Sequence, residues 1–237
     1  MNNEFQNQVV LVTGAAGSLG AVIGEQFAAA GARVYRTDLR PVPQPHFLAG
    51  DLTAPAFVAQ LVEHILNEAG RLDVLVNNAG ICPRTPLLEI TEAEWQQVFA
   101  VNLTAAFRLS QACLRPMMAQ RSGCIINVAS LAGQVGGIAV GAHYSATKAA
   151  LECLTKTLAR HGAPYGIRAN AVAPGIIESE MTRQAGDAQL AAFRQSIPLG
   201  RLGSPAEVAG PILFLASPRA SYITGVTLDI NGGLKMG

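Results

Sequence analysis

Hydrophobic residues along the chain follow two alternating patterns. Short runs that are almost entirely apolar, such as VVLVT at 9–13, alternate with longer segments in which apolar side chains recur every three to four residues. The short runs are typical of strands buried on both faces, and the longer segments are typical of amphipathic helices. Their alternation predicts βαβ units around a parallel sheet, and therefore an α/β fold.

The expected elements can be placed by residue number. We predict about seven strands, at Val9–Thr13, Arg33–Thr37, Phe47–Ala49, Leu72–Asn77, Cys124–Val128, Ile167–Val172 and Thr227–Ile230. Helices are expected near 18–30, 54–69, 91–119, 142–161 and 204–216. This order is typical of a Rossmann-type, doubly wound parallel sheet, and we expect one domain over residues 1–237. The less regular stretch 178–201 is a candidate substrate lid.

Composition narrows the classes of function. The 237 residues are 50% hydrophobic and 14% charged, which is enough apolar material for a large core. The net charge is +1 and the basic residues are scattered, so nothing indicates binding to nucleic acid or to a membrane surface. The first ten residues do not resemble a secretory signal, and the four cysteines form no CxxC pair. We therefore expect a cytoplasmic, metal-free protein with a small-molecule partner.

A glycine-rich turn follows the first predicted strand and leads into a helix. Its residues include Gly14, Gly17, Ser18, Leu19 and Gly20. Glycines allow the backbone to approach a pyrophosphate closely, and the helix N-terminus supplies free N–H groups and a favourable dipole. The turn is therefore a candidate phosphate cradle, although the same sequence could also form a simple tight connection.

Asp38 at the end of the second predicted strand points to the kind of dinucleotide. A carboxylate at this position can accept hydrogen bonds from the adenosine ribose and repels a 2′-phosphate, so it favours NAD over NADP. Asp38 could instead be a solvated loop residue or pair with Arg36 or Arg40. Those arginines leave NADP open as a second possibility.

Three side chains in the second half of the chain suggest proton chemistry. Ser130 follows the fifth predicted strand, and Tyr144 and Lys148 lie four residues apart in a predicted helix. Residues at that spacing share one helix face, so the ammonium could favour the phenolate and lower the pKa of Tyr144. The pair would then be a usable acid or base, although such a pair on a helix is more often simple surface packing.

Further short motifs follow one another along the chain. They are TGAAGSLG at 13–20, Asp38, GDLT at 50–53, NNAG at 77–80, VNL at 101–103, NVAS at 127–130, YSATK at 144–148 and PGIIESEMT at 174–182. In this order they resemble the motifs of the short-chain dehydrogenase/reductase family, and the resemblance covers essentially the whole chain.

The resemblance implies a catalytic tetrad and a set of cofactor contacts. The tetrad would be Asn102, Ser130, Tyr144 and Lys148. Ser130 would orient the reacting oxygen, Tyr144 would exchange its proton, and Asn102 would hold a relay water. Lys148 would hold the nicotinamide ribose and lower the tyrosine pKa. The remaining implied cofactor contacts are Asp51 and Leu52 at the adenine, Asn78, Ala79 and Gly80 along the adenosine ribose, Ile177 and Ser179 at the carboxamide, and Pro174 and Gly175 beside them.

The chain departs from the family pattern at three places. Ser18 stands where a loop glycine is usual, and we expect it to cap the helix and contact phosphate. The separation between Ser130 and Tyr144 is one residue longer than usual, which indicates an altered substrate loop at 131–143. Asn231 stands where aspartate is more frequent, and we interpret it as structural.

Three residues near the predicted site have competing interpretations. His143 is expected to point away from the catalytic face, so a role as catalytic base is the weaker alternative. Cys82 could line the pocket, but nothing in its sequence surroundings suggests an activated thiolate. Arg84 could bind a substrate carboxylate, or could be a solvated loop residue, which we favour.

The sequence thus predicts an NAD(H)-dependent enzyme that interconverts a secondary alcohol and a ketone. The alternatives are a catalytically silent dinucleotide-binding sensor or scaffold, and a different reaction, such as epimerisation or dehydration, on the same cofactor. The resemblance also implies a homo-oligomer, tetramer or dimer, with helices near 102–118 and 145–161 at an interface.

Overall fold

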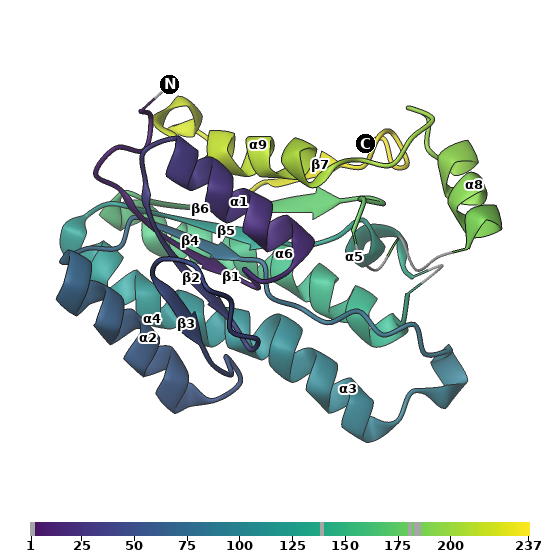
Figure 1. Ribbon diagram of the computed structural model, residues 1–237, viewed down its shortest axis with the longest axis horizontal. Helices are drawn as coiled ribbons and strands as arrows, with labels where there is room; N and C mark the ends of the chain where they lie inside the picture. Colours follow the sequence, from purple (N-terminus) through teal and green to yellow (C-terminus); the bar gives the residue numbers. More distant parts are fainter. Residues whose placement is uncertain (1–2, 138–139, 180–181, 183–185) are drawn as a thin grey trace.

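One parallel sheet of seven strands forms the centre of the computed structural model (Figure 1). The structure describes residues 3–137, 140–179, 182 and 186–237. The strands are β1 Val9–Thr13, β2 Arg33–Asp38, β3 Phe47–Ala49, β4 Val74–Asn77, β5 Gly123–Val128, β6 Ile167–Pro174 and β7 Thr227–Ile230. Their order across the sheet is β3-β2-β1-β4-β5-β6-β7, and every pair is parallel. The predicted doubly wound sheet is confirmed.

Helices cover both faces of this sheet. The long helices are α1 Ser18–Ala29, α2 Pro55–Ala69, α4 Ala105–Gln120, α6 Ala142–Gly162 and α9 Pro205–Ala216. Helices α1 and α9 contribute buried residues to one hydrophobic cluster, and α2, α4 and α6 contribute to the other. In Figure 1, α1 and α9 lie above the strands and α2 and α4 below them. Within the described part of the chain, no helix is long and apolar enough to cross a bilayer.

Strand β1 illustrates why continuous apolar runs are needed. Successive side chains of a strand point to opposite faces of the sheet. Val10 and Val12 accordingly pack in the α1/α9 cluster, while Val9 and Leu11 pack in the cluster with α2, α4 and α6. Both faces are covered, so a polar residue at any of these four positions would be buried among apolar side chains.

The predicted helix near 91–119 is confirmed as one helical run, but it is not α-helical throughout. A π-helical segment, Ala100–Thr104, joins α3, Glu92–Phe99, directly to α4. Apolar periodicity predicts that a segment is helical, but it does not distinguish a single π turn within an α-helical run. Asn102 lies inside this turn.

Two short helices occur in stretches that sequence patterns predict as irregular. Helix α5, Ala132–Val135, lies in the segment between Ser130 and α6. Helix α8, Asp187–Ser196, lies within the candidate lid at 178–201. Residues 180–181 and 183–185 of that stretch lie outside the described residues. One further correction concerns β4, which begins at Val74 and not at Leu72.

Strands β1 and β4 meet where the strand order reverses direction. From β1 the sheet continues to β2 and β3 on one side, and β4 begins the half on the other side. The connections after β1 and β4 therefore run in opposite directions, which leaves a crevice at the carboxyl ends of these two strands. The Thr13 hydroxyl bridges the two strand ends. Its Oγ1 accepts hydrogen bonds from the backbone N–H groups of Asn78 and Ala79, both at 2.9 Å, and contacts the Val76 carbonyl oxygen at 3.3 Å.

We predict that Thr13→Val destabilises the protein by about 2 kcal/mol, because it leaves two backbone N–H groups at the crevice without their acceptor. Valine preserves the shape and strand propensity of threonine, so the loss isolates the hydroxyl. Urea unfolding monitored by circular dichroism measures it. Thr227→Val on β7, whose side chain makes no hydrogen bond to the described residues, is the matched control. An equal free energy of unfolding for Thr13→Val and Thr227→Val would contradict this role of Thr13.

Candidate active site

The glycine turn after β1 packs too tightly for larger residues. Gly14 adopts φ +65°, in the left-handed region that favours glycine. A Cβ at Gly14 would lie 2.8 Å from the Cα of Ala79, and a Cβ at Gly20 would collide with the carbonyl oxygen of Gly14. The backbone of the turn is therefore held against the segment after β4. This fits the close backbone approach that a bound pyrophosphate requires.

The N-terminus of α1 differs from the sequence expectation in one detail. Gly17 occupies the N-cap position, and no side chain caps the helix. Ser18 is the first helical residue, so the expected capping by Ser18 is wrong. The reason is positional, since a capping side chain must come from the residue before the helix. The uncapped N–H groups and the helix dipole remain directed at the crevice, as an anion site requires.

Asp38 lies at the rim of the same crevice and is fixed by the backbone. Its Oδ2 accepts a hydrogen bond from the N–H of Ala16 at 3.1 Å, and its Oδ1 accepts one from the N–H of Arg40 at 3.1 Å. Arg36 does not pair with it. The Arg36 guanidinium is buried and donates to the carbonyl oxygens of Val34 and Gly24, at 3.2 and 3.1 Å. Of the two arginines near Asp38, only Arg40 borders the cleft.

A cleft of about 610 Å³ runs from Asp38 past the glycine turn. A second cavity, of about 320 Å³, adjoins it and contains the proposed proton-handling residues. The predicted cofactor residues on the first are Gly14, Gly17, Ser18, Leu19, Gly20, Asp38, Asp51, Leu52, Asn78, Ala79, Gly80 and Ser179. Those on the second include Tyr144, Lys148, Pro174, Gly175 and Ile177. Leu19, Asn78, Gly80 and Ser179 border both, so the two form one continuous groove. This groove has the residues to hold a dinucleotide.

Ser130, Tyr144 and Lys148 come together in the second cavity. Ser130 follows β5, and the other two lie one turn apart on α6. The Lys148 Nζ donates a hydrogen bond of 2.7 Å to the carbonyl oxygen of Val128 and lies 5.5 Å from the centre of the Tyr144 ring. Burial of the ammonium lowers the pKa of Lys148 to about 8.

The electrostatics of Tyr144 correct one expectation. Burial raises the pKa of Tyr144 above its ordinary value; the neighbouring Cys82 thiol adds to this, and the hydrogen bond with Ser130 opposes it. In the protein alone, the expected lowering by Lys148 does not dominate, because removing a phenolate from water costs more than a lysine 5.5 Å from the ring centre returns. Burial also raises the pKa of Cys82, to about 11, which agrees with an unactivated thiol.

Asn102 is the one predicted site residue that borders neither cavity. Its side chain is fully buried in the π-helical segment and faces the backbone of Ile81. The Oδ1 accepts from the Ile81 N–H at 2.8 Å, and the Nδ2 donates to the Ile81 carbonyl at 2.9 Å. A Cβ at Gly80 would lie 3.2 Å from the Asn102 Oδ1 and 3.6 Å from the Lys148 Nζ. Asn102 thus anchors the loop after β4 directly behind Lys148.

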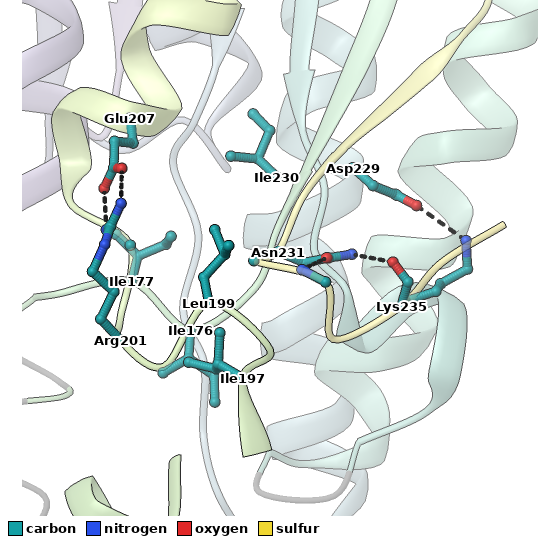
Figure 2. A pocket seen from close by; sticks show the side chains of 13 residues that line it. Ile176, Ile177, Ile197, Leu199, Arg201, Glu207, Asp229, Ile230, Asn231 and Lys235 are labelled. Carbon is teal, nitrogen blue, oxygen red and sulfur yellow. Dashed lines mark hydrogen bonds and ion pairs between the residues drawn. The ribbon is translucent and has the colours of Figure 1, made fainter. Parts of the chain in front are cut away.

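The segment after β6 is supported by the C-terminal turn (Figure 2). Asn231 accepts a hydrogen bond from the N–H of Gly233 at 2.9 Å and donates to the carbonyl of Lys235 at 3.2 Å. A Cβ at Gly175 would lie 2.9 Å from the Cα of Asn231. The interpretation of Asn231 as structural is confirmed, since its side chain stabilises the turn against which Gly175 packs.

A buried polar chain connects the site elements and was not predicted. Asn77 on β4 donates to Ser110 on α4 and to Asn127 on β5, both at 2.9 Å. Asn127 donates in turn to Thr155 on α6 at 2.8 Å. These bonds fix α6 against the sheet. The available signal was the presence of asparagines inside otherwise apolar strands, which must find partners when buried.

Comparisons with known proteins agree with this geometry. A family model described as enoyl-(acyl carrier protein) reductase matches residues 14–235. The 3-oxoacyl-[acyl-carrier-protein] reductase of Vibrio cholerae is 42% identical over 242 aligned positions, which cover 98% of this chain and 99% of that protein. The Escherichia coli protein of the same name is 41% identical over 98% of this chain and 99% of its own length. The crystal structure of a short-chain dehydrogenase/reductase from Brucella melitensis, described as glucose/ribitol dehydrogenase, has a TM-score of 0.92 and 34% identity, and each chain is covered completely.

The chain therefore belongs to the short-chain dehydrogenase/reductase family. It is an oxidoreductase, and as a member of this family it binds a nicotinamide dinucleotide.

The lowered pKa of Lys148 generates a prediction about cofactor binding. Below a pH of about 8 the ammonium is charged, and above it the charge is lost. If Lys148 holds the nicotinamide ribose, the dissociation constant for NADH should increase as the pH rises through the lysine pKa. Fluorescence titration of NADH across this range measures the effect.

Two variants of α6 complete this experiment. Lys148→Met should bind NADH more weakly and lose the pH-dependent change. Lys156→Met, at an exposed position two turns further along α6, is the matched control and should retain it. The same pH dependence in the Lys148→Met variant as in wild type would refute the assignment.

Proposed function

We propose that the protein interconverts a secondary alcohol and a ketone with NAD(H), using Tyr144 as the proton donor and acceptor. The observation that carries the proposal is the convergence of Ser130, Tyr144 and Lys148 in a cavity continuous with the dinucleotide groove. Two hydroxyl groups lie beside a cation in this cavity, which supports proton exchange and hydride transfer at one site.

The chemistry of each side chain follows from its position. In the reduction direction, the Ser130 hydroxyl orients the ketone oxygen, and the Tyr144 hydroxyl donates its proton to that oxygen as the alcohol forms. When bound, the dinucleotide supplies the hydride, and its oxidised form carries a positive charge on the nicotinamide. Lys148, held by the Val128 carbonyl, would contact the ribose and stabilise the phenolate that remains. In the oxidation direction the phenolate accepts the alcohol proton.

Asn102 has a supporting part in this proposal. Its side chain makes two hydrogen bonds to the Ile81 backbone and donates to the Thr147 hydroxyl of α6 at 3.3 Å, so we assign it the task of holding the loop behind Lys148. The π-helical segment around it changes the backbone hydrogen-bonding pattern, a feature that often occurs at functional sites. The relay water suggested by the family resemblance would then be held near this segment.

Asp38 supports NAD over NADP. Its carboxylate is fixed at the rim of the cleft by two backbone N–H groups, where it would repel a 2′-phosphate. Arg36, one of the two cations that could have offset this repulsion, is turned into the core. Arg40 remains as the single nearby cation on the cleft among the described residues.

The names of the relatives suggest the substrate class to test first. Proteins up to 42% identical are called 3-oxoacyl-[acyl-carrier-protein] reductases, so 3-oxoacyl thioesters are the first ketones to assay.

Arg84 and Cys82 border the cavity beside Tyr144, and Phe193 of α8 borders it within the proposed lid. We propose that residues 178–201 close over the substrate, with α8 as their rigid part.

A homo-oligomer, tetramer or dimer, is part of the proposal. Phe107 on α4 is 45% exposed, and Cys153 on α6 is exposed as well. Both lie on the helices expected at an interface, where a partner subunit would cover apolar surface.

A dinucleotide-binding sensor or scaffold remains the alternative function. It would need the groove but not the cavity beside it. A buried lysine with a lowered pKa next to a tyrosine is costly for a protein that only binds. The geometry therefore favours catalysis. It also favours redox chemistry over epimerisation or dehydration, because a single acid/base residue, Tyr144, lines the cavity at the end of the groove proposed for the nicotinamide.

We predict that Tyr144→Phe lowers kcat by about a hundredfold or more while the dissociation constant for NADH changes little, because the phenol oxygen acts on the substrate. Lys148→Ala should impair both quantities.

In the oxidation direction, the wild-type rate should increase with pH as Tyr144 loses its proton. In Lys148→Ala that increase should move to higher pH, since the stabilising cation is absent. Steady-state kinetics and NADH fluorescence test this; a Tyr144→Phe enzyme with near wild-type kcat would refute the assignment.

We predict that wild-type kcat/KM is higher with NADH than with NADPH, and that Asp38→Ala raises the relative efficiency with NADPH by about tenfold or more, because a like-charge repulsion is removed. Arg40→Gln is the matched control on the same cleft rim. It should leave NADH use nearly unchanged and reduce any residual NADPH use. Equal or better wild-type efficiency with NADPH would overturn the preference.

A further inference from the structure

His143 is a completely buried histidine immediately before Tyr144. Its side chain is 0% exposed, and it borders neither the dinucleotide cleft nor the substrate cavity. It lies in the first turn of α6, which begins at Ala142. Burying an imidazole without a partner is costly, so its two ring nitrogens need to be accounted for.

The Nδ1 atom of His143 faces the backbone of the proton-donating residue. It accepts a hydrogen bond from the Tyr144 N–H at 2.9 Å. The first N–H groups of a helix have no acceptor within the helix, and the N-cap residue Gly141 has no side chain to supply one. His143 thus satisfies the N–H of Tyr144, and it can do so only when Nδ1 carries no proton.

The Nε2 atom faces a different element. It lies 3.3 Å from the Oε1 of Glu94 on α3, and this oxygen also accepts a hydrogen bond of 2.6 Å from the Thr85 hydroxyl. Among the described residues, Nε2 has no hydrogen bond of good geometry. The Thr85 hydrogen bond, and secondarily His143, hold the pKa of Glu94 below its ordinary value, so Glu94 is charged at neutral pH.

Thr85 belongs to the loop that follows the NNAG motif, and this loop forms one wall of the substrate cavity through Cys82 and Arg84. A second bond ties the same loop to α6, because the Gly141 N–H donates to the Pro83 carbonyl at 2.9 Å. The space at Gly141 is filled by the imidazole itself, with which a Cβ there would collide. Arg84 therefore stands between two anchored residues.

We propose that His143 is a positioning residue whose two nitrogens have separate tasks: Nδ1 fixes the backbone of Tyr144, and Nε2, through Glu94 and Thr85, fixes the substrate loop. The kinetic part of this inference rests on the proposed function. Loss of the first contact should affect proton transfer, while loss of the second should affect substrate binding.

Two amide substitutions separate the tasks, because each can replace one of the two ring nitrogens of His143 and not the other. In His143→Asn the side-chain oxygen can occupy the Nδ1 position, and the contact with Glu94 is lost. In His143→Gln the amide can reach the Nε2 position, and the acceptor for the Tyr144 N–H is lost. Thr85→Val removes only the loop contact and is the matched comparison for His143→Asn.

We expect His143→Asn and Thr85→Val to raise KM for the ketone about fivefold to tenfold and to leave kcat within about twofold. His143→Gln should lower kcat by about tenfold to a hundredfold with little change in KM, because small displacements of a catalytic group are costly. His143→Ala should show both losses. The same kinetic pattern in the asparagine and glutamine variants would overturn the division of tasks.

Hydrogen exchange followed by mass spectrometry gives a readout that does not depend on turnover. The segment containing the Tyr144 N–H should exchange faster in His143→Gln than in His143→Asn. Residues 81–91 should exchange faster in His143→Asn and in Thr85→Val than in wild type. If wild type shows no turnover but this exchange pattern appears, the proposed function fails and the positioning inference stands. Uniformly faster exchange in every variant, with parallel losses of thermal stability, would reduce His143 to a packing role and refute the inference.

Discussion

The hydrogen bond between the Lys148 ammonium and the Val128 carbonyl is the interaction on which the site depends. It joins the second turn of α6 to the carboxyl end of β5 over 2.7 Å, inside the protein. Burying a cation costs free energy, and this one has a single carbonyl partner among the described residues. The consequence is a lysine whose pKa is lowered to about 8 and whose charge remains available to groups entering the cavity.

The surrounding architecture keeps that lysine in place. The polar chain from Asn77 through Asn127 to Thr155 fixes α6 against the sheet on one side. Asn102, in the π-helical segment, holds the loop after β4 behind Lys148 on the other. At the neighbouring crevice, the Thr13 hydroxyl and the tight glycine turn bring the ends of β1 and β4 together. Cofactor groove and proton-handling cavity therefore meet at one edge of the sheet, as expected for an open parallel sheet.

Much of this arrangement could be predicted from the sequence. Strand positions followed from apolar runs, because a strand covered on both faces is mostly apolar on both faces. The glycine turn and Asp38 could be placed because a phosphate cradle constrains the backbone at fixed points. The other cofactor residues were predicted from the motifs that resemble the family. Every predicted cofactor residue borders the groove, and Asn102 is the one predicted catalytic residue that does not.

The remaining features depend on tertiary contacts that periodicity does not report. The π turn at Ala100–Thr104 lies within a continuous helical run, so the apolar pattern predicts the helix but not the π turn inside it. The short helix α5 has only four residues, too few to form a recognisable pattern. His143 was expected to point away from the catalytic face, and it does. Its contacts with Glu94 and with the backbone of Tyr144 only become visible once α3, the loop and α6 are placed together.

We propose that Lys148 and the bound oxidised cofactor together overcome the effect of burial on Tyr144, whose pKa is raised in the protein alone. An ultraviolet difference titration of the phenolate, comparing wild type with Tyr144→Phe, isolates this tyrosine. We predict that Tyr144 ionises above the ordinary tyrosine pKa of about 10 without cofactor and at clearly lower pH when the protein is saturated with NAD. The same Tyr144 pKa with and without NAD would contradict it.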